Sequence, residues 1–471
     1  MSDQYDLVVI GAGPAGENVA DRAVKKGLTA AIVESELVGG ECSYWACMPS
    51  KALLRPAAAV DEAGRVEGVR GATLDPAGVL DRRDGFASHW KDDGQVKWLN
   101  GAHVDLYRGH GRITGPKIVT VGGTQLRARH AVAIATGSGA LIPPIPGLAE
   151  ARPWTSREAT SAKEAPRRLA VIGGGVVGCE MATAWQALGS QVTLMVRGRL
   201  LAGTEEFAGQ LVTDGLRRAG VDVRLGVSAT AVRRSPADGA AGSAAGGPKG
   251  PVTLELDDGT AVEADEVLAA TGRTPRTGDL GLETVGLEPG GWLDVDGTMR
   301  VKGVDGGWLY AAGDVNHLAL LTHMGKYQAR ICGDAIAARA HGRPPASTAW
   351  ADQTAVPQVI FTEPEVASVG PTAAQAGAEG RTIRVVDYDL GAVAGAKLFQ
   401  DGYTGQARMV VDEDRGTMIG ATLAGPGAGE LIHAATVAVA GQVALDQLWH
   451  AVPSYPTMSE VWLRLLEAYG L

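Results

Sequence analysis

The first 34 residues carry a hydrophobic pattern that predicts a strand, a helix and a second strand. Residues 5–10 read YDLVVI and residues 29–34 read TAAIVE, and both are short runs dominated by β-branched and aliphatic side chains. Between them, ENVADRAVKKG has the composition and spacing of a helix. Strands that are apolar along their whole length are typical of parallel sheets covered on both faces, so we expect an α/β fold.

Glycines occupy the junction between the first strand and the helix. Gly11, Gly13 and Gly16 form the pattern GxGxxG, and Glu34 ends the second strand. A glycine pattern in this setting, with an acid about 20 residues further on, is typical of dinucleotide binding. The glycines let a pyrophosphate approach the helix N-terminus, and Glu34 can accept hydrogen bonds from a ribose hydroxyl. The alternative is a glycine turn that serves packing alone.

The same pattern recurs in the run RLAVIGGGVVGCEMATAWQALG, which contains Gly173, Gly175 and Gly178. The strand that follows ends with Arg197 and Arg199 instead of an acid. Because arginines favour a 2′-phosphate through charge-assisted hydrogen bonds, we predict NADPH in preference to NADH. Alternatively, both arginines lie on a solvated face. Two dinucleotide sites in one chain imply electron transfer, since a nicotinamide gives up a hydride that a flavin can accept.

Length and charge narrow the class of protein. The 471 residues suggest two to four domains, and a formal charge of −10 argues against a nucleic acid partner. We find neither a signal peptide nor an apolar segment near the roughly 18 residues that a membrane span needs. The sequence therefore predicts a cytoplasmic protein. Structural disulfides are rare in the cytoplasm.

Two of the four cysteines, Cys42 and Cys47, lie five positions apart, and we expect this pair to be redox-active. On one straight helix they would be separated by a rise of roughly 7.5 Å, beyond what a disulfide tolerates. If they bridge, Cys42 lies in a distorted turn leading into a helix, whose first turn suits Pro49. The alternatives are a metal site, for which we see too few ligands and predict no metal, or two inert thiols. Cys179 and Cys332 lie in small-residue helical segments and are expected to be buried and inert.

The segment GGECSYWACMPSK closely resembles the active-site segment of the pyridine nucleotide–disulfide oxidoreductases, the family of glutathione reductase, dihydrolipoamide dehydrogenase and mercuric reductase. Four further segments resemble motifs of the family in the same order along the chain. They are ATGS with Thr136 and Gly137, ATGR with Gly272, WLYAAGDV with Gly313 and Asp314, and VIFTEPEVASVG at residues 359–370.

The resemblance implies roles for individual residues around an FAD. Lys51 of the PSK triplet is expected near the flavin, paired with Glu180, because a buried lysine needs such a partner. Cys47 is expected to be the flavin-proximal thiol, and Cys42 the interchange thiol that meets the substrate. Asp314 is expected to bind the ribityl chain. Tyr44 and Trp45, between the cysteines, could line a pocket for a flat substrate or pack beside the flavin.

The resemblance also implies a fold of two Rossmann-like dinucleotide-binding domains and an α+β C-terminal dimerisation domain. Residues 1–155 and 278–348 are expected to bind FAD, residues 156–277 to bind NADPH, and residues 349–471 to form the interface of a homodimer. In this family the C-terminal segment of one subunit completes the active site of the other. A Gly-rich stretch at 235–251 reads as a surface loop between two strands.

The C-terminal segment departs from the family. The disulfide reductases have a segment resembling HPT-x-SE, whose histidine relays protons, whereas this chain has Tyr455 at that position and retains Glu460. Because the pKa of free tyrosine is about 10 and that of free histidine about 6.5, tyrosine relays protons poorly at neutral pH. His450 could substitute if the loop doubles back, and a shifted alignment would put Val452 at the relay position.

The sequence thus predicts an enzyme that moves electrons between NADPH and a small-molecule acceptor through FAD and a Cys42–Cys47 disulfide. We expect the acceptor to be an unusual disulfide or dithiol. One alternative is a quinone or metal-ion reductase that needs no histidine relay, and another is a dihydrolipoamide dehydrogenase-like subunit of a larger complex. Tyr455 and Glu460 complete the predicted catalytic set.

Overall fold

The computed structural model of the chain describes residues 3–236 and 249–471, which fold as two compact units. The first unit consists of Met1–Pro49, Asp84–Gly139 and Arg273–Gln353. The second consists of Ser50–Arg83, Ala140–Gly272 and Thr354–Leu471. Both are mixed α/β, and the predicted fold class is confirmed.

A seven-stranded sheet forms the centre of the first unit, in the order β3-β2-β1-β6-β5-β4, with β16 pairing β6. The strands β1, β2, β3, β6 and β16 are parallel, and β4 and β5 are an antiparallel extension. The bounds are β1 (Asp3–Ile10), β2 (Ala30–Glu34), β3 (Val104–Arg108), β4 (Gly111–Gly115), β5 (Ile118–Val121), β6 (Thr124–Ile134) and β16 (Leu309–Ala311).

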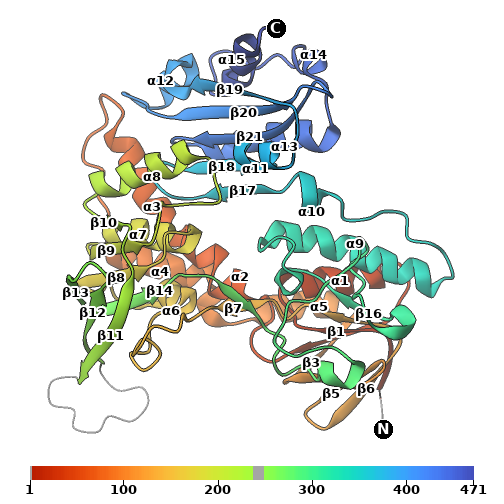
Figure 1. The fold of residues 1–471 in the computed structure, drawn as a ribbon. Coiled ribbons are helices and arrows are strands. Elements are labelled where there is room, and N and C mark those ends of the chain that lie inside the picture. Colours follow the sequence, from red (N-terminus) through yellow and green to blue (C-terminus); the bar gives the residue numbers. More distant parts are fainter. Residues whose placement is uncertain (1–2, 237–248) are drawn as a thin grey trace. The chain divides into compact units, whose positions relative to one another are not determined.

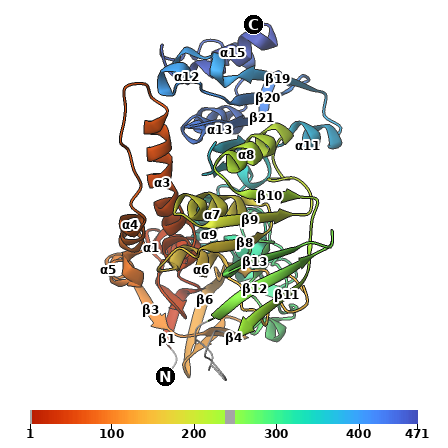
Figure 2. The same cartoon turned by 90° about the vertical axis from the view of Figure 1, so that its left-hand side faces the viewer.

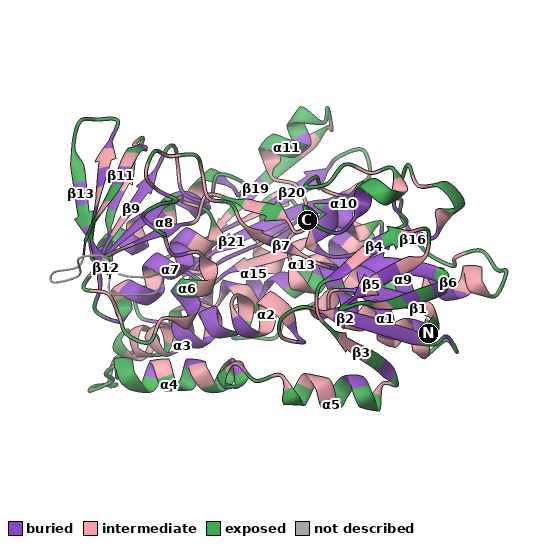
Figure 3. Ribbon diagram, turned by 90° about the horizontal axis from the view of Figure 1, so that it is seen from below, coloured by how far each residue is buried: buried purple, intermediate pink, exposed green. Residues whose placement is uncertain are grey.

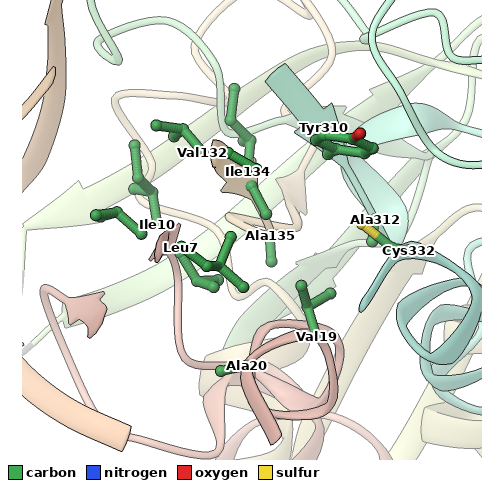
Figure 4. Packing of buried hydrophobic residues seen from close by; sticks show 14 of the residues in the cluster. Leu7, Ile10, Val19, Ala20, Val132, Ile134, Ala135, Tyr310, Ala312 and Cys332 are labelled. Atoms are coloured by element: carbon green, nitrogen blue, oxygen red, sulfur yellow. The ribbon is translucent and has the colours of Figure 1, made fainter. Parts of the chain in front are cut away.

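The two helices α1 (Pro14–Val24) and α9 (Thr322–Ala340) lie side by side against this sheet (Figure 1). Leu7 and Val132 from the central strands, Val19 from α1 and Cys332 from α9 are all fully buried in one apolar cluster (Figure 4). The predicted strand at 5–10 is buried from Leu7 onward, as expected for a central parallel strand.

The second unit contains three sheets. A four-stranded parallel sheet has the order β10-β9-β8-β14, and a three-stranded antiparallel sheet has the order β11-β12-β13 (Figure 2). The bounds are β8 (Arg168–Ile172), β9 (Gln191–Val196), β10 (Asp222–Leu225), β11 (Ala229–Pro236), β12 (Lys249–Leu256), β13 (Ala261–Ala264) and β14 (Glu266–Ala269). The loop predicted at 235–251 connects β11 to β12, and its residues 237–248 lie outside the described residues.

The third sheet of this unit has five antiparallel strands in the order β17-β18-β21-β20-β19. Helix α13 (Ile432–Gly441) packs on β21 and β18, and α15 (Glu460–Tyr469) packs on β19. The bounds of the strands are β17 (Pro357–Ile360), β18 (Val366–Val369), β19 (Ile383–Asp389), β20 (Gln406–Asp412) and β21 (Thr417–Ala424).

Residues 50–83 and 140–155, which were expected in the FAD-binding domain, group with the second unit, as does Thr354–Leu471. In the first of these stretches, α3 (Cys47–Gly64) and α4 (Pro76–Phe86) contribute the apolar residues Leu53 and Val79 to the cluster around Trp185. The division into three domains stays a prediction. Most of α4 is nonetheless exposed, in contrast to the buried strands (Figure 3).

The remaining helices lie between the strands in the sequence or after the last strand. Short helix α2 (Gly40–Tyr44) precedes α3, and α5 (Asp93–Gly101) packs on β3. In the second unit, α7 (Val176–Ala187) and α8 (Glu206–Arg218) follow β8 and β9 and contact them or their neighbours. The remaining short helices are α6 (Ser156–Ser161), α10 (Ala351–Thr354), α11 (Ala373–Ala378), α12 (Ala394–Phe399) and α14 (Leu445–Leu448).

The close approach of α1 and α9 generates a testable prediction. A Cβ added to Gly333 of α9 would lie 2.7 Å from the Arg22 Cβ and 2.9 Å from the Val19 carbonyl oxygen. We expect Gly333→Ala to lower the free energy of unfolding by about 1–3 kcal/mol, because the helices must separate. Gly85→Ala in α4 is the control: its Cβ meets nothing within 4 Å. Chemical denaturation should show that this control stabilises by about 0.5–1 kcal/mol, and equal effects of the two variants would contradict the packing argument.

Candidate functional site

The turn from β1 to α1 can be made only by glycines. Gly11 has φ +99°, and a Cβ there would lie 2.5 Å from the Ala135 carbonyl oxygen. A Cβ on Gly16 would lie 1.9 Å from the Gly11 carbonyl oxygen. Gly13 differs, since its nearest neighbour is the Gly40 Cα at 4.0 Å, so an open space remains at the start of α1. No side chain caps α1 in the described structure, and its first N–H groups are therefore placed to bind an anion.

Glu34 is held beside this turn by the backbone. Its Oε2 accepts a hydrogen bond from the Ala12 N–H at 2.7 Å, and its Oε1 accepts one from the Glu36 N–H at 2.8 Å. The carboxylate is fixed at the end of β2, the position that the sequence predicts. The second lone pair on each oxygen can still accept from a ribose hydroxyl.

A second group of predicted residues gathers around Asp314 in the same unit. Gly313 has φ +84° and its N–H donates to the buried Gln328 at 2.8 Å. The Ser138 hydroxyl donates to Asp314 Oδ2 at 2.5 Å, and Arg273 lies 3.7 Å from the same oxygen. Ser138 and Arg273 are the last residues of the motifs ATGS and ATGR, but the sequence did not indicate that they contact Asp314.

Thr136 and Gly137, two neighbouring predicted residues, both bond to the backbone of Arg276. The Thr136 hydroxyl donates to the Arg276 carbonyl oxygen at 2.9 Å, and the Gly137 carbonyl oxygen accepts from the Arg276 N–H at 3.1 Å. Gly272 belongs to the second unit, where its carbonyl oxygen accepts from the Leu141 N–H at 3.0 Å. Their contribution is backbone geometry, with Gly137 at φ +70° and Gly272 at φ +151°.

The turn from β8 to α7 repeats the first glycine turn. A Cβ on Gly173 would lie 2.4 Å from the Ala270 carbonyl oxygen, and one on Gly178 would lie 1.9 Å from the Gly173 carbonyl oxygen. Gly175 meets nothing within 4 Å, which leaves the start of α7 open in the same way. The two predicted dinucleotide sites therefore share one construction.

The two arginines after β9 differ in their surroundings. The Arg199 guanidinium donates to the carbonyl oxygens of Ala202 at 2.8 Å and Thr204 at 2.7 Å, so it holds the loop in shape. Arg197 is exposed at the end of β9. Of the pair predicted to bind a 2′-phosphate, Arg197 is thus the one with donors turned to solvent.

The two cysteines lie on separate helices. Cys42 is in α2, and α3 begins at Cys47 after a break at Trp45, which has φ −138° and ψ 3°. Both are thiols in this structure. The Cys47 sulfur lies 3.2 Å from the hydroxyl of Thr322, the first residue of α9. The two cysteines therefore do not share one straight helix, and Pro49 lies in the first turn of α3. The disulfide between them stays a prediction.

Neighbouring groups shift the acidity of Cys42 in opposite directions. Its pKa is raised mainly by a hydrogen bond to the Cys47 sulfur and by burial. The hydroxyl of Thr322 and the positive charge of Lys326 act the other way and lower this pKa. Sequence reasoning missed both residues, because their proximity to the cysteines depends on how α9 packs.

Tyr44 packs inside the first unit and leaves little surface for a substrate. Its side chain is 2% exposed, and its hydroxyl donates to the Val38 carbonyl oxygen at 3.0 Å. Its ring meets Trp45 edge-on at 5.6 Å between centroids. Of the two roles considered for Tyr44, the structure favours packing.

Lys51 and Glu180 form the predicted ion pair, within the second unit. The Lys51 Nζ donates to both carboxylate oxygens of Glu180, at 2.9 and 2.7 Å. Glu180 is buried and also accepts from the Phe361 N–H at 3.1 Å. The Lys51 ammonium lies 4.9 Å from the centroid of the Phe361 ring, a contact that the sequence did not reveal.

The predicted C-terminal residues have contrasting environments. Tyr455 is 76% exposed, whereas Glu460 is buried at the start of α15, with its Oε1 3.4 Å from Arg464. His450 is exposed, as is Val452. No cluster of three or more metal-binding side chains occurs in the described ranges, and no helix there is long and apolar enough to cross a membrane.

Comparison with protein families decides the assignment. Residues 5–342 match the family described as pyridine nucleotide-disulphide oxidoreductase, and residues 356–465 match the dimerisation domain of the same family. The chain is a member of this family. It is therefore an oxidoreductase and a flavoprotein, FAD-dependent with NAD(P)H, and the dimerisation domain supports a homodimer.

Curated relatives are similar over most of their length. A dihydrolipoyl dehydrogenase of Haloferax volcanii is 32% identical, covering 98% of this chain and 95% of the relative. A mercuric reductase of Staphylococcus aureus is 31% identical, covering 97% and 81%. Among solved structures, the Cu(II) complex of the HOCl-induced flavoprotein disulfide reductase RclA of Escherichia coli has a TM-score of 0.83 at 23% identity, with 99% of each chain covered. The last likeness supports the fold alone.

The residues of this family member fit the expected FAD. The open space at Gly13, the uncapped start of α1 and the fixed carboxylate of Glu34 suit a pyrophosphate and a ribose. Asp314 follows the positive-φ Gly313, and its carboxylate suits the hydroxyls of a ribityl chain. These residues would hold the cofactor, which supplies hydride and electron-transfer chemistry when bound.

The Lys51–Glu180 ion pair leads to a second testable prediction. We expect Glu180→Gln to lower the free energy of unfolding by about 1–3 kcal/mol, because the half-buried ammonium loses its counter-charge while the shape is kept. Denaturant unfolding measures this loss. Glu288→Gln, at an exposed position in the first unit, is the control and should stay within about 0.5 kcal/mol of the unmodified protein. A similar small effect at Glu180 would show that the pair contributes little.

Proposed function

We propose that this enzyme moves electrons from NADPH to a small-molecule acceptor through FAD and the Cys42–Cys47 pair. The observation that carries the proposal is the placement of the two thiols. They are hydrogen-bonded to one another on separate helices, and Cys47 contacts Thr322 at the N-terminus of α9. A helix N-terminus favours a thiolate, which is the reactive form of a cysteine.

The roles of the two thiols are proposed from the resemblance to the family. We assign Cys47 as the thiol that faces the flavin, and Cys42 as the interchange thiol that attacks the acceptor. We assign Lys51, paired with Glu180, to the flavin as well. Cys179 and Cys332 take no part, because both side chains are 0% exposed and a substrate cannot reach them.

We infer that the acceptor is an unusual disulfide or dithiol. Tyr455 stands where the disulfide reductases have a relay histidine, and general acid–base catalysis is typically worth roughly 10²–10⁴-fold. Reduction of an ordinary peptide disulfide should therefore be slow. The same argument disfavours a dihydrolipoyl dehydrogenase role, although relatives with that name are 32% identical. Catalytic roles of Tyr455 and Glu460, in a site completed by the partner of a homodimer, remain part of this proposal, as does a cytoplasmic location.

A second candidate function is a quinone or metal-ion reductase. It is favoured by the missing histidine, which matters less when no leaving thiolate needs a proton, and by the 31% identity to a mercuric reductase. In that case electrons could bypass Cys42. The two functions differ in whether turnover needs the cysteine pair.

An anaerobic titration with NADPH, followed by absorbance, tests the proposed function. After two electrons we expect a broad long-wavelength band, because a Cys47 thiolate lies against oxidised flavin. The double variant Cys42→Ser, Cys47→Ser should lose this band and, by at least about 100-fold, its turnover with the acceptor. Bleaching of the flavin without the band in the unmodified enzyme, together with full turnover of the double variant on quinones, would instead support the second candidate.

The choice of nicotinamide nucleotide gives a separate prediction. We propose that Arg197 contacts the 2′-phosphate of NADPH, so Arg197→Ala should raise the KM for NADPH about tenfold, the loss of one charge-assisted hydrogen bond of about 1.5 kcal/mol. Steady-state kinetics with NADH, which lacks this phosphate, serves as the internal control and should be unchanged. An equal loss with both nucleotides would point to a disturbed loop. That outcome is the one we expect for Arg199→Ala, since Arg199 holds the loop carbonyls.

A further inference from the structure

The loop that follows β9 lies directly against the second glycine turn. Residues 197–205 connect β9 to α8, and the Leu201 N–H donates to the carbonyl oxygen of Gly174 at 2.8 Å. Gly174 is the middle residue of the turn from β8 to α7, and a Cβ added to it would lie 2.7 Å from the Leu200 Cδ2. The position of this loop and the shape of the turn therefore depend on one another.

The backbone of the loop is held in a conformation that it would not adopt unaided. Leu201 has φ +49°, in the left-handed region that residues with a side chain rarely occupy. Its carbonyl oxygen accepts from the Thr204 N–H at 2.9 Å and from the Thr204 hydroxyl at 2.8 Å, and both residues are buried. Because such a conformation persists only where the surroundings impose it, the binding shape of the loop depends on how its end is anchored.

Glu205 anchors the end of the loop to the C-terminal part of the same unit. It directly precedes α8, a position whose side chain commonly accepts from the first N–H groups of the helix, but in the described structure it does not do so. Its Oε1 accepts instead from the Ala373 N–H at 2.7 Å, and its Oε2 accepts from Arg408 at 2.9 Å. Ala373 is the first residue of α11 and Arg408 lies in β20, so the carboxylate joins the loop to two distant elements.

Burial makes the arginine necessary to this anchor. Glu205 is 6% exposed, and a buried carboxylate is costly unless a positive charge and hydrogen bonds replace the lost water. Arg408 supplies the charge, and it is itself oriented by Asp387 of β19, whose oxygens accept from its Nε and Nη2 at 2.7 and 2.8 Å. Helix α8 also contacts β21 of the same sheet (Figure 2). The start of α8 is therefore fixed to the five-stranded sheet.

We propose that Glu205 is a positioning residue for the nicotinamide nucleotide, and that Arg408 and the Ala373 N–H hold it in place. Through this anchor, the five-stranded sheet fixes the loop against the second glycine turn and so sets the affinity of that turn for the nucleotide. Both groups that hold Glu205 lie within residues 356–465, the part of the chain that matches the dimerisation domain. The inference rests on the proposed function in one respect, namely that the nucleotide binds at the turn from β8 to α7.

Loss of the anchor should weaken both nicotinamide nucleotides by the same factor. NADP+ and NAD+ share the pyrophosphate that a glycine turn binds, and they differ only in the 2′-phosphate that we assigned to Arg197. Without the anchor, a smaller fraction of molecules has the loop and turn in the binding conformation, and the apparent dissociation constant rises by the inverse of that fraction. A fall to about one fifth would raise both constants about fivefold. Removal of Arg197 should weaken NADP+ alone.

The experiment is a calorimetric titration of the oxidised, FAD-loaded enzyme with NADP+ and, separately, with NAD+. We expect Arg408→Gln to raise both dissociation constants about 3- to 10-fold, because Glu205 loses its counter-charge and the anchor opens.

Ala373→Pro is a milder variant that removes the N–H bonded to Glu205, keeps every charge, and decides the question if Arg408→Gln does not fold. Proline suits the first position of a helix, and Thr372 before it already has the extended backbone that proline requires, with φ −68° and ψ 163°. We expect this variant to raise both dissociation constants about 2- to 5-fold.

Arg234→Gln is the matched control. The Arg234 side chain is 7% exposed in the same unit, and it pairs with Glu266 at 2.7 Å. This variant should bind both nucleotides as the unmodified enzyme does. The inference is overturned if Ala373→Pro leaves both dissociation constants unchanged, if its effect is confined to NADP+, or if Arg234→Gln weakens binding equally.

Failure of the proposed function has a different signature. If the nucleotide binds elsewhere, Arg197→Ala will leave the affinity for NADP+ unchanged, as will the variants of the anchor. If the inference alone fails, Arg197→Ala will still weaken NADP+ about tenfold while Ala373→Pro has no effect. A bypass of the cysteine pair would leave all of these constants as they are, because the titration involves no electron transfer.

Discussion

The rest of the structure depends on a steric constraint in the two glycine turns, which leave no room for a side chain between strand and helix. In each turn, a Cβ on the third glycine would lie 1.9 Å from the carbonyl oxygen of the first glycine, at Gly16 and Gly11 and again at Gly178 and Gly173. No adjustment of a neighbouring side chain relieves such a contact, because the atom in the way belongs to the backbone. The helix must therefore start directly at the end of its strand, which leaves its N–H groups beside the sheet edge where a pyrophosphate can bind.

The same steric constraint explains how the first residue of α9 comes to contact a cysteine. Once α1 is fixed against the sheet, α9 packs along it through the small residues Ala15 and Gly325, and then through Gly333. This contact sets where α9 begins, and so places Thr322 beside Cys47. A feature of backbone sterics near the N-terminus thereby determines the surroundings of a thiol that belongs to another helix.

The sequence predicted those parts of the site that local patterns encode. Both glycine turns, the carboxylate of Glu34, the cysteine spacing and the Lys51–Glu180 pair depend on short motifs or on a family resemblance, and the structure contains each of the corresponding elements. What the sequence could not predict depends on packing between distant segments. Thr322 lies about 280 residues after the cysteines, and it contacts Cys47 only because of how α9 packs. The sequence also did not indicate that the Arg199 guanidinium donates to loop carbonyl oxygens, and its contact with a 2′-phosphate stays a prediction. The grouping of residues 50–83 with the second unit depends on the packing of α3 and α4, which no local pattern reveals.

The surroundings of the cysteine pair depend on helices of the first unit and not on the C-terminal segment. A relay histidine on a C-terminal segment can act only when that segment is in place, and in this chain the corresponding Tyr455 is 76% exposed within its own subunit. The hydroxyl of Thr322, by contrast, is fixed at the start of α9 by the packing of that helix on α1, and it lies 3.2 Å from the Cys47 sulfur. It lowers the pKa of Cys42, against the hydrogen bond to Cys47 and the burial that raise this pKa. A hydroxyl can donate a hydrogen bond to a thiolate, so Thr322 can hold the reactive form of the pair in place without supplying the proton relay of a histidine.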